Sequence, residues 1–211
     1  MFPAPAWNCC SVCSRCIIKP SKDSIHDFAE WCTAKEITRL FDIQLTPSMG
    51  LGAVAVNTIE EGETFIEVPV DLIISTKQVK EIWTTRGFTD WPDDFSIAPL
   101  IIWLMEETCT AHSDFKTYID LLPFDFTEYP LNWNDEDLEK CQGTGLKETI
   151  QNLRMKLMKQ FELLRRLSEE YPQILHEWKF AKFVWAYQVI NSRWWEFMDE
   201  YGSDGFIVPC A

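Results

Sequence analysis

The sequence predicts an α+β fold in which short β-strands flank a mainly helical block. Apolar and polar residues alternate with a period of two in short stretches between residues 41 and 68, which is typical of half-buried strands. Apolar residues then recur every three or four positions between about residues 97 and 190, which is typical of amphipathic helices. A short apolar run at residues 206–209 predicts that the chain returns to a strand.

The composition is that of a folded globular chain. Of its 211 residues, 46% are hydrophobic and 25% are charged, and 10 Trp with 14 Phe favour a packed core over disorder. No apolar run reaches the roughly 18 to 20 residues of a membrane span, and the first residues lack the pattern of a secretory signal. The formal net charge of −14 argues against general binding to nucleic acid or anionic membranes. We therefore expect neither partner, and a cytoplasmic or nuclear location with an organelle as the alternative.

The first predicted helix spans residues 24–36, with Ser24 as its N-cap and Asp27 near its positive end. Three short strands follow, at residues 41–45, 50–56 and 64–68. Pro47 ends the first of these strands, and a polar turn joins the other two.

From about residue 91 the pattern changes from strands to helices. Ser75 is the expected cap of a short helix just before this change, and Asn134 caps a later one. The predicted helices after the strands cover residues 77–83, 97–107, 115–122, 134–141, 147–170 and 179–197. The longest of them carries a single apolar stripe, which predicts packing against neighbouring helices and no chemistry. A turn at 201–205 is expected before the final strand.

Eight cysteines occur in the chain, and without a secretory signal we expect free thiols. Four of them crowd near the N-terminus: Cys9, Cys10, Cys13 and Cys16. The last three have a spacing that could hold a metal ion, with His26 or Cys32 as a fourth ligand. The second, well-separated ligand pair of a usual zinc site is missing. The pattern favours a tail over residues 1–23 that is separate from the fold, with a metal-binding adaptor as an alternative.

Gly50 and Gly52 flank Leu51 at the start of the second predicted strand. Glycines let a backbone run close to a ligand because no Cβ stands in the way, although a plain tight turn is the commoner explanation. The surrounding residues favour the first explanation. Gly50-Leu51-Gly52-Ala53-Val54-Ala55, a turn with Gly62-Glu63 and a strand ending in Val68-Pro69 resemble the start of a SET domain. The similarity is to the branch that includes the Rubisco large-subunit methyltransferases.

Further landmarks of that branch follow in the same order over residues 24–211. They are Leu104-Met105-Glu106-Glu107, Phe115-x-x-Tyr118-x-x-x-Leu122-Pro123, Trp133 to Gly143, Phe183-Val184-Trp185-Ala186, Asn191-Ser192-Arg193 and Ile207-Val208-Pro209. The resemblance implies a split SET domain. Its parts would be a tail at 1–23, a first SET segment at 24–90, an inserted helical domain at 91–178 that helps to hold a protein substrate, and a resumed SET core at 179–211.

The resemblance also implies methyl transfer from S-adenosyl-L-methionine to a side-chain nitrogen, usually that of a protein lysine. Such a nitrogen must be neutral and aligned in order to attack the methyl group. The implied cofactor contacts are Met49, Gly50, Leu51, Gly52 and Arg193, and the implied lysine-channel residues are Ser192 and Trp195. Without the resemblance, Arg193 would be read as a cation that suits a helix C-terminus and Trp195 as core packing.

Two departures from the family pattern affect this expectation. Met49 stands where relatives often carry an acidic residue. The Asn-His motif and the catalytic tyrosine, which should follow Val208-Pro209, are missing because Cys210-Ala211 ends the sequence. We therefore expect a catalytically incomplete fragment of a protein-lysine N-methyltransferase, with no catalytic residue of its own. The alternative is a non-catalytic interaction module that uses the helical block. The substrate protein, the choice between lysine and histidine and the oligomeric state are not predicted.

Overall fold

The fold is α+β, as predicted. A computed structural model describes residues 20–46, 50–92, 95–123, 125–173, 175–176, 178–199 and 202–209. The helices are α1 (Lys22–Ala34), α2 (Thr76–Thr85), α3 (Ala98–Glu107), α4 (Lys116–Ile119), α5 (Asp135–Glu139), α6 (Leu146–Glu170) and α7 (Phe180–Arg193). The strands are β1 (Thr38–Arg39), β2 (Phe41–Thr46), β3 (Gly50–Ala55), β4 (Ile66–Glu67), β5 (Ile74–Ser75), β6 (Trp195–Asp199) and β7 (Gly202–Ile207). The four N-terminal cysteines and Met49 lie outside the described residues.

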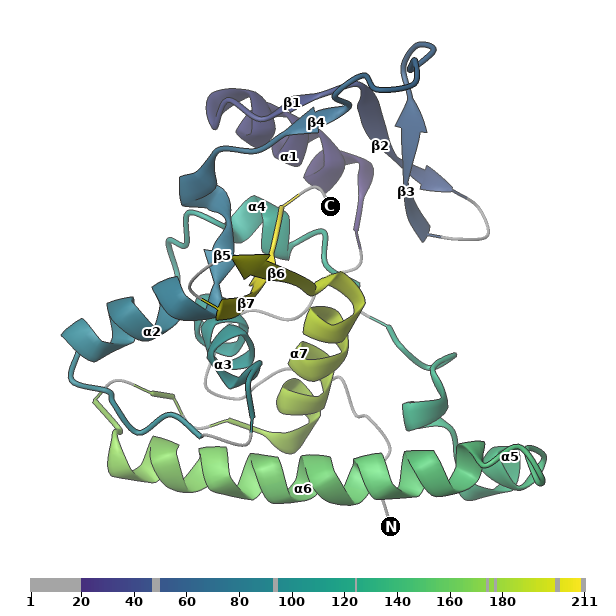
Figure 1. Cartoon of the computed structure of the whole chain (residues 1–211), viewed down its shortest axis with the longest axis vertical. Helices are drawn as coiled ribbons and strands as arrows, with labels where there is room; N and C mark the ends of the chain where they lie inside the picture. Colours follow the sequence, from purple (N-terminus) through teal and green to yellow (C-terminus); the bar gives the residue numbers. More distant parts are fainter. Residues whose placement is uncertain are drawn as a thin grey trace.

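The strands form small antiparallel sheets rather than one large sheet. β2 pairs with β3, and β1 pairs with β4. These four strands lie with α1 at one end of the molecule, and the long α6 crosses the opposite end (Figure 1). β5 pairs with β7, which also pairs with β6. The β5–β7 ladder places Ile74 opposite Ile207 and so joins residues that precede and follow the helical block. The proposed domain boundaries remain a prediction.

The helix caps show where local sequence signals act. Ser75 caps α2, with its Oγ 3.1 Å from the Gln78 backbone nitrogen that donates to it. Asn134 caps α5 in the same way. The prediction for α1 was wrong by one turn, because Ser21 is the cap and Ser24 is its partner in a reciprocal capping box. Either serine is a residue type that caps helices. With Ser21 as the cap, the side chain of each serine accepts a hydrogen bond from the backbone nitrogen of the other.

The prediction of a helix to residue 197 was also wrong. α7 ends at Arg193, and Trp195–Asp199 forms β6 of a hairpin with β7. The predicted turn at 201–205 overlaps β7 itself, and Tyr201 lies outside the described residues. A Cβ on Gly205 would lie 2.1 Å from the Trp194 Nε1 atom, so glycine at 205 leaves the space that the Trp194 indole occupies. The predicted strand at 64–68 shortens to β4.

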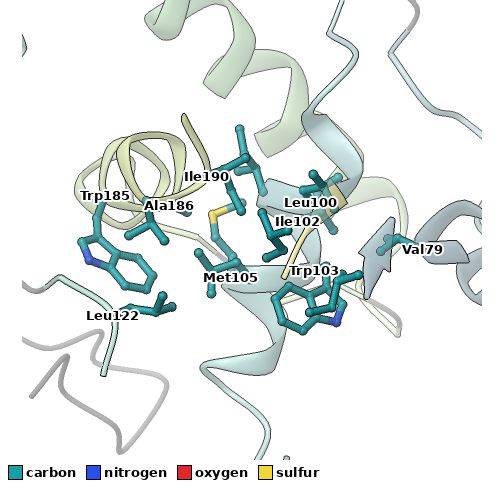
Figure 2. Close-up of a cluster of buried hydrophobic side chains, with 14 of the residues drawn as sticks. Val79, Leu100, Ile102, Trp103, Met105, Leu122, Trp185, Ala186 and Ile190 are labelled. Atoms are coloured by element: carbon teal, nitrogen blue, oxygen red, sulfur yellow. The ribbon is translucent and has the colours of Figure 1, made fainter. Parts of the chain in front are cut away.

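The main core lies between α3 and α7. Met105 of α3 lies beside Ala186 and Ile190 of α7, and Trp185 packs with Leu122 at one side (Figure 2). Leu100 and Ile102 belong to the same cluster, with Leu100 on the side of α3 toward Val79 of α2. All of these side chains are fully or almost fully buried. Burial of this much apolar surface fixes α7 in place, which matters because its C-terminal end carries Ser192 and Arg193. None of the helices among the described residues is long and apolar enough to cross a membrane.

Candidate functional site

A pocket lies where the β2–β3 hairpin meets α1, the α4 segment and the C-terminal end of α7. Its volume is about 210 Å³. The lining side chains come from parts of the chain that are distant in sequence, and they are Phe28, Phe41, Ile43, Leu51, Gly52, Ala53, Tyr118, Leu121, Leu122 and Arg193. The lining side chains are therefore apolar apart from the Arg193 guanidinium group and the Tyr118 hydroxyl group. Small-molecule sites typically enclose roughly 300 to 1,000 Å³, so these walls suit part of a cofactor-sized ligand.

The β2–β3 hairpin presents one apolar face to this pocket. Its register pairs Ile43 with Ala53 and Leu45 with Leu51, so the apolar residues of both strands share one face. Asp42 lies on the opposite face because successive side chains of a strand alternate. The pocket wall is thus a direct consequence of the period-two pattern in the sequence.

The start of β3 requires a glycine at position 50. Gly50 has a φ of +73°, in the left-handed region that favours glycine. Its carbonyl oxygen accepts a 2.9 Å hydrogen bond from the Thr46 hydroxyl group, which closes the hairpin end. Gly52 has no such backbone requirement, and a Cβ there would make only an ordinary 3.5 Å contact with Thr46.

Arg193 reaches the pocket from the last turn of α7. Its Nη1 atom donates a 3.0 Å hydrogen bond to the Ser192 Oγ atom, which itself donates to the Val189 carbonyl oxygen at 2.8 Å. This relay orients the guanidinium group through the serine. A second hydrogen bond anchors α7: the Trp185 indole donates to the Pro123 carbonyl oxygen at 2.8 Å.

A buried carboxylate fixes the segment that leads into α7. Glu106 of α3 accepts hydrogen bonds at 3.0 Å from the His176 backbone nitrogen and at 2.6 Å from the Trp178 indole, and its other oxygen contacts the His176 ring. These bonds satisfy a group that would be costly to bury alone. Glu106 belongs to one of the sequence landmarks, and its contacts give that landmark a structural role away from the pocket.

Two tyrosine hydroxyl groups away from the pocket have shifted pKa values. A hydrogen bond to Asp90, 2.6 Å long, raises the pKa of Tyr171 to about 12. Burial raises the pKa of Tyr187 on α7. Both groups therefore stay protonated and neutral at physiological pH, and neither lines the pocket.

Comparison with known proteins identifies the fold. No family model matches the chain. The chain is 30% identical over 154 residues to the chloroplastic ribulose-1,5-bisphosphate carboxylase/oxygenase large subunit N-methyltransferase of Nicotiana tabacum, and 27% identical over 151 residues to that of Pisum sativum. Each match covers 68% of this chain and 29% of the relative, so the chain spans about a third of the length of these relatives.

Solved structures agree with the sequence comparison. The SET domain of LSMT bound to lysine and AdoHcy superposes with a TM-score of 0.77 at 20% identity, over 90% of this chain and 44% of that one. Rubisco LSMT bound to AdoMet superposes with a TM-score of 0.73 at 19% identity, over 88% and 43% of the two chains. The chain has a SET-domain fold. The resemblance to the Rubisco large-subunit methyltransferase branch, drawn from the sequence landmarks, is confirmed.

Within this SET fold, three of the predicted site residues meet in one place. Leu51, Gly52 and Arg193 line the pocket together, although some 140 residues of sequence separate the strand from the arginine. Gly50 adjoins Leu51 and shapes the backbone before it.

The other predicted site residues lie beside the pocket or outside the described residues. Ser192 contacts Arg193 and does not line the pocket. Trp195 starts β6 with 56% of its surface exposed, so the alternative of core packing does not hold for it. Met49 falls outside the described residues.

Sequence reasoning missed the far wall of the pocket. Phe28 was visible only as part of an apolar helix face, and Tyr118 only as part of an aromatic landmark. Nothing in either local pattern distinguishes a side chain that lines a pocket from one that fills a core. Their shared position depends on the packing of α1 against α4.

Proposed function

We propose that this chain supplies the S-adenosylmethionine-facing part of a SET-domain protein-lysine N-methyltransferase. The observation that carries the proposal is the meeting of Leu51, Gly52 and Arg193 in one pocket. The proposal is supported by the neighbouring structures, which are described as bound to AdoMet, AdoHcy and lysine. The alternative of a non-catalytic interaction module is not favoured, because it offers no reason for this pocket.

The residues of the pocket fit the cofactor by their chemistry. S-adenosylmethionine, when bound, supplies an electrophilic methyl group. The Arg193 guanidinium group suits its carboxylate, because charge-assisted pairs of this kind are strong and directional. Leu51 and the apolar hairpin face exclude water from one side of the ligand, and Gly52 lines the same wall. Ser192 orients Arg193 through the 3.0 Å hydrogen bond.

We assign the substrate to a lysine-bearing protein, with Trp195 as a contact for the apolar part of the lysine side chain. The exposed indole of Trp195 offers a flat apolar surface for such a stem. Among the described tyrosines, Tyr118 lines the pocket at its buried side, and we assign no catalytic role to it. The proposed partners include neither nucleic acid nor a membrane.

The domain division follows from the same proposal. Residues 24–90 and 179–211 would form one SET unit, joined by the β5–β7 ladder, with residues 91–178 inserted between them. Because α3 packs on α7, the proposed insertion and the proposed resumed segment would share one core. The proposed location is the cytoplasm or nucleus, with an organelle as the alternative because the curated relatives are named chloroplastic. Fractionation of cells expressing a tagged chain would separate these locations.

Calorimetric titration with S-adenosylmethionine tests the proposal. We expect binding in the micromolar range, and Arg193→Gln should weaken it by about tenfold to hundredfold because a charge-assisted hydrogen bond is lost. Arg166→Gln is the matched control, since Arg166 is an exposed arginine of α6 that pairs with Glu162 and does not line the pocket. A folded chain without measurable affinity, or equal losses in both variants, would contradict the proposal.

A further inference from the structure

The wall of the pocket that faces α1 is its most deeply buried part. Phe28 of α1 is 2% exposed and Tyr118 of α4 is 4% exposed, yet both line the pocket. Leu51 and Arg193, on the other walls, are half-buried. The pocket thus has a closed aromatic side and a more open side that bears the cation. Helix α1 therefore takes part in the site that the hairpin and α7 form.

The closed side is held by a continuous set of aromatic rings. The Phe28 ring stacks on Trp31 with centroids 5.5 Å apart and lies 6.4 Å from the Tyr118 ring. Trp31 in turn lies 6.2 Å from Phe115, which meets Trp103 of the core edge to face at 5.4 Å. The position of Phe28 is thereby linked to the α3–α7 core, since packed aromatic pairs resist relative movement.

One hydrogen bond connects α1 to the α4 segment directly. The Trp31 indole nitrogen donates to the Asp114 carbonyl oxygen at 2.9 Å, across 83 residues of sequence. Trp31 does not line the pocket. Its hydrogen bond fixes the orientation of the ring on which Phe28 stacks. α1 lies above α4 at the end of the molecule that carries the hairpin (Figure 1).

We propose that α1 is a functional wall of the ligand pocket, with Phe28 as a residue that contacts the bound cofactor and Trp31 as a positioning residue that holds Phe28 in place. This inference rests on the proposed function and extends it, because it assigns ligand affinity to a helix that precedes the glycine-containing strand. Loss of the Trp31 hydrogen bond lets the wall shift, and a small displacement of a ligand contact reduces affinity.

The test compares two tryptophan-to-phenylalanine variants of the whole chain. Trp31→Phe keeps an aromatic ring and removes the donor, and we expect it to weaken S-adenosylmethionine binding by about threefold to tenfold. Trp133→Phe is the matched control, because the Trp133 indole donates a similar 3.0 Å hydrogen bond to the Glu128 carbonyl oxygen and does not line the pocket. The control should lose a similar amount of thermal stability and keep the wild-type affinity.

A second readout separates positioning from general destabilisation. Added S-adenosylmethionine should slow amide hydrogen exchange in α1 of the wild-type chain, and Phe28→Leu should weaken binding more than Trp31→Phe does. Wild-type binding with unchanged affinity in Trp31→Phe and Phe28→Leu would overturn this inference alone. A folded wild-type chain that does not bind S-adenosylmethionine would overturn the proposed function and this inference together.

Discussion

The α3–α7 core and the β2–β3 hairpin use apolar residues in opposite ways. Leu104 on α3 is fully buried among other side chains, whereas Leu45 on β2 is 49% exposed. Leu104 does not line the pocket. The hairpin keeps an apolar face that its neighbours cover only in part, and Ile43, Leu51 and Ala53 of this face line the pocket. Residues such as Leu104 therefore contribute stability, whereas the hairpin contributes a wall of the proposed ligand pocket.

The largest expected effect is a difference in the free energy of unfolding between a core variant and a hairpin variant. Leu104→Ala should lower the free energy of unfolding by about 2 to 5 kcal/mol, because it removes buried methyl groups and leaves a cavity. Leu45→Ala should lower it by less than about 1 kcal/mol, because the side chain is already half in water. Urea unfolding curves of the two variants measure both values. Equal losses would break the distinction between core and hairpin.

A smaller change in the free energy of unfolding is expected for a substitution that strains the backbone of the hairpin. Gly50→Ala should lower the free energy of unfolding by about 1 kcal/mol, since alanine is strained at a positive φ even where space is free. Gly52→Ala is the control, and it should change stability by less than about 0.5 kcal/mol because its Cβ makes an ordinary contact. Thermal unfolding of both variants checks this order, and a larger loss in Gly52→Ala would show that the hairpin end is wrongly described.

The smallest effect concerns an ion-pair network on the surface of α6, the helix at the opposite end of the molecule from the hairpin. Hydrogen bonds from Arg165 and then Arg166 lower the pKa of Glu162 on α6 from 4.5 to about 2. A lowered folded-state pKa means that this pairing stabilises the chain above pH 4.5 and is lost as the pH falls toward 2. The stability difference between wild type and Glu162→Gln should therefore shrink over that window. A difference that stays constant with pH would contradict the pairing, and the exposed position predicts that the whole effect is small.

Much of the fold was predictable where the signal is local. The apolar stripe gave α6 to within one residue of its observed start at Leu146, and Ser75 marked the start of α2. The strand β6 was missed because its aromatic residues, including Trp195, also fit a helical spacing. These residues form a strand because they pair with β7. This tertiary contact cannot be read from the local sequence pattern of residues 195–199.

The candidate site was also predictable only in part. Leu51, Gly52 and Arg193 were expected from family landmarks, and the structure brings them to one pocket. Phe28 and Tyr118 could not be assigned to it, because a buried aromatic residue has the same sequence signature in a core and in a pocket wall. Only the packing of α1 on α4 distinguishes the two.

The most direct test of the central claim is the map of backbone amide chemical shifts on titration of the labelled chain with S-adenosylmethionine. The account predicts that the largest shifts occur at Leu51, Gly52 and Arg193, with smaller shifts at Phe28 and none along the exposed face of α6. Shifts concentrated on α6, with the hairpin unaffected, would contradict the assignment of the pocket as the cofactor site.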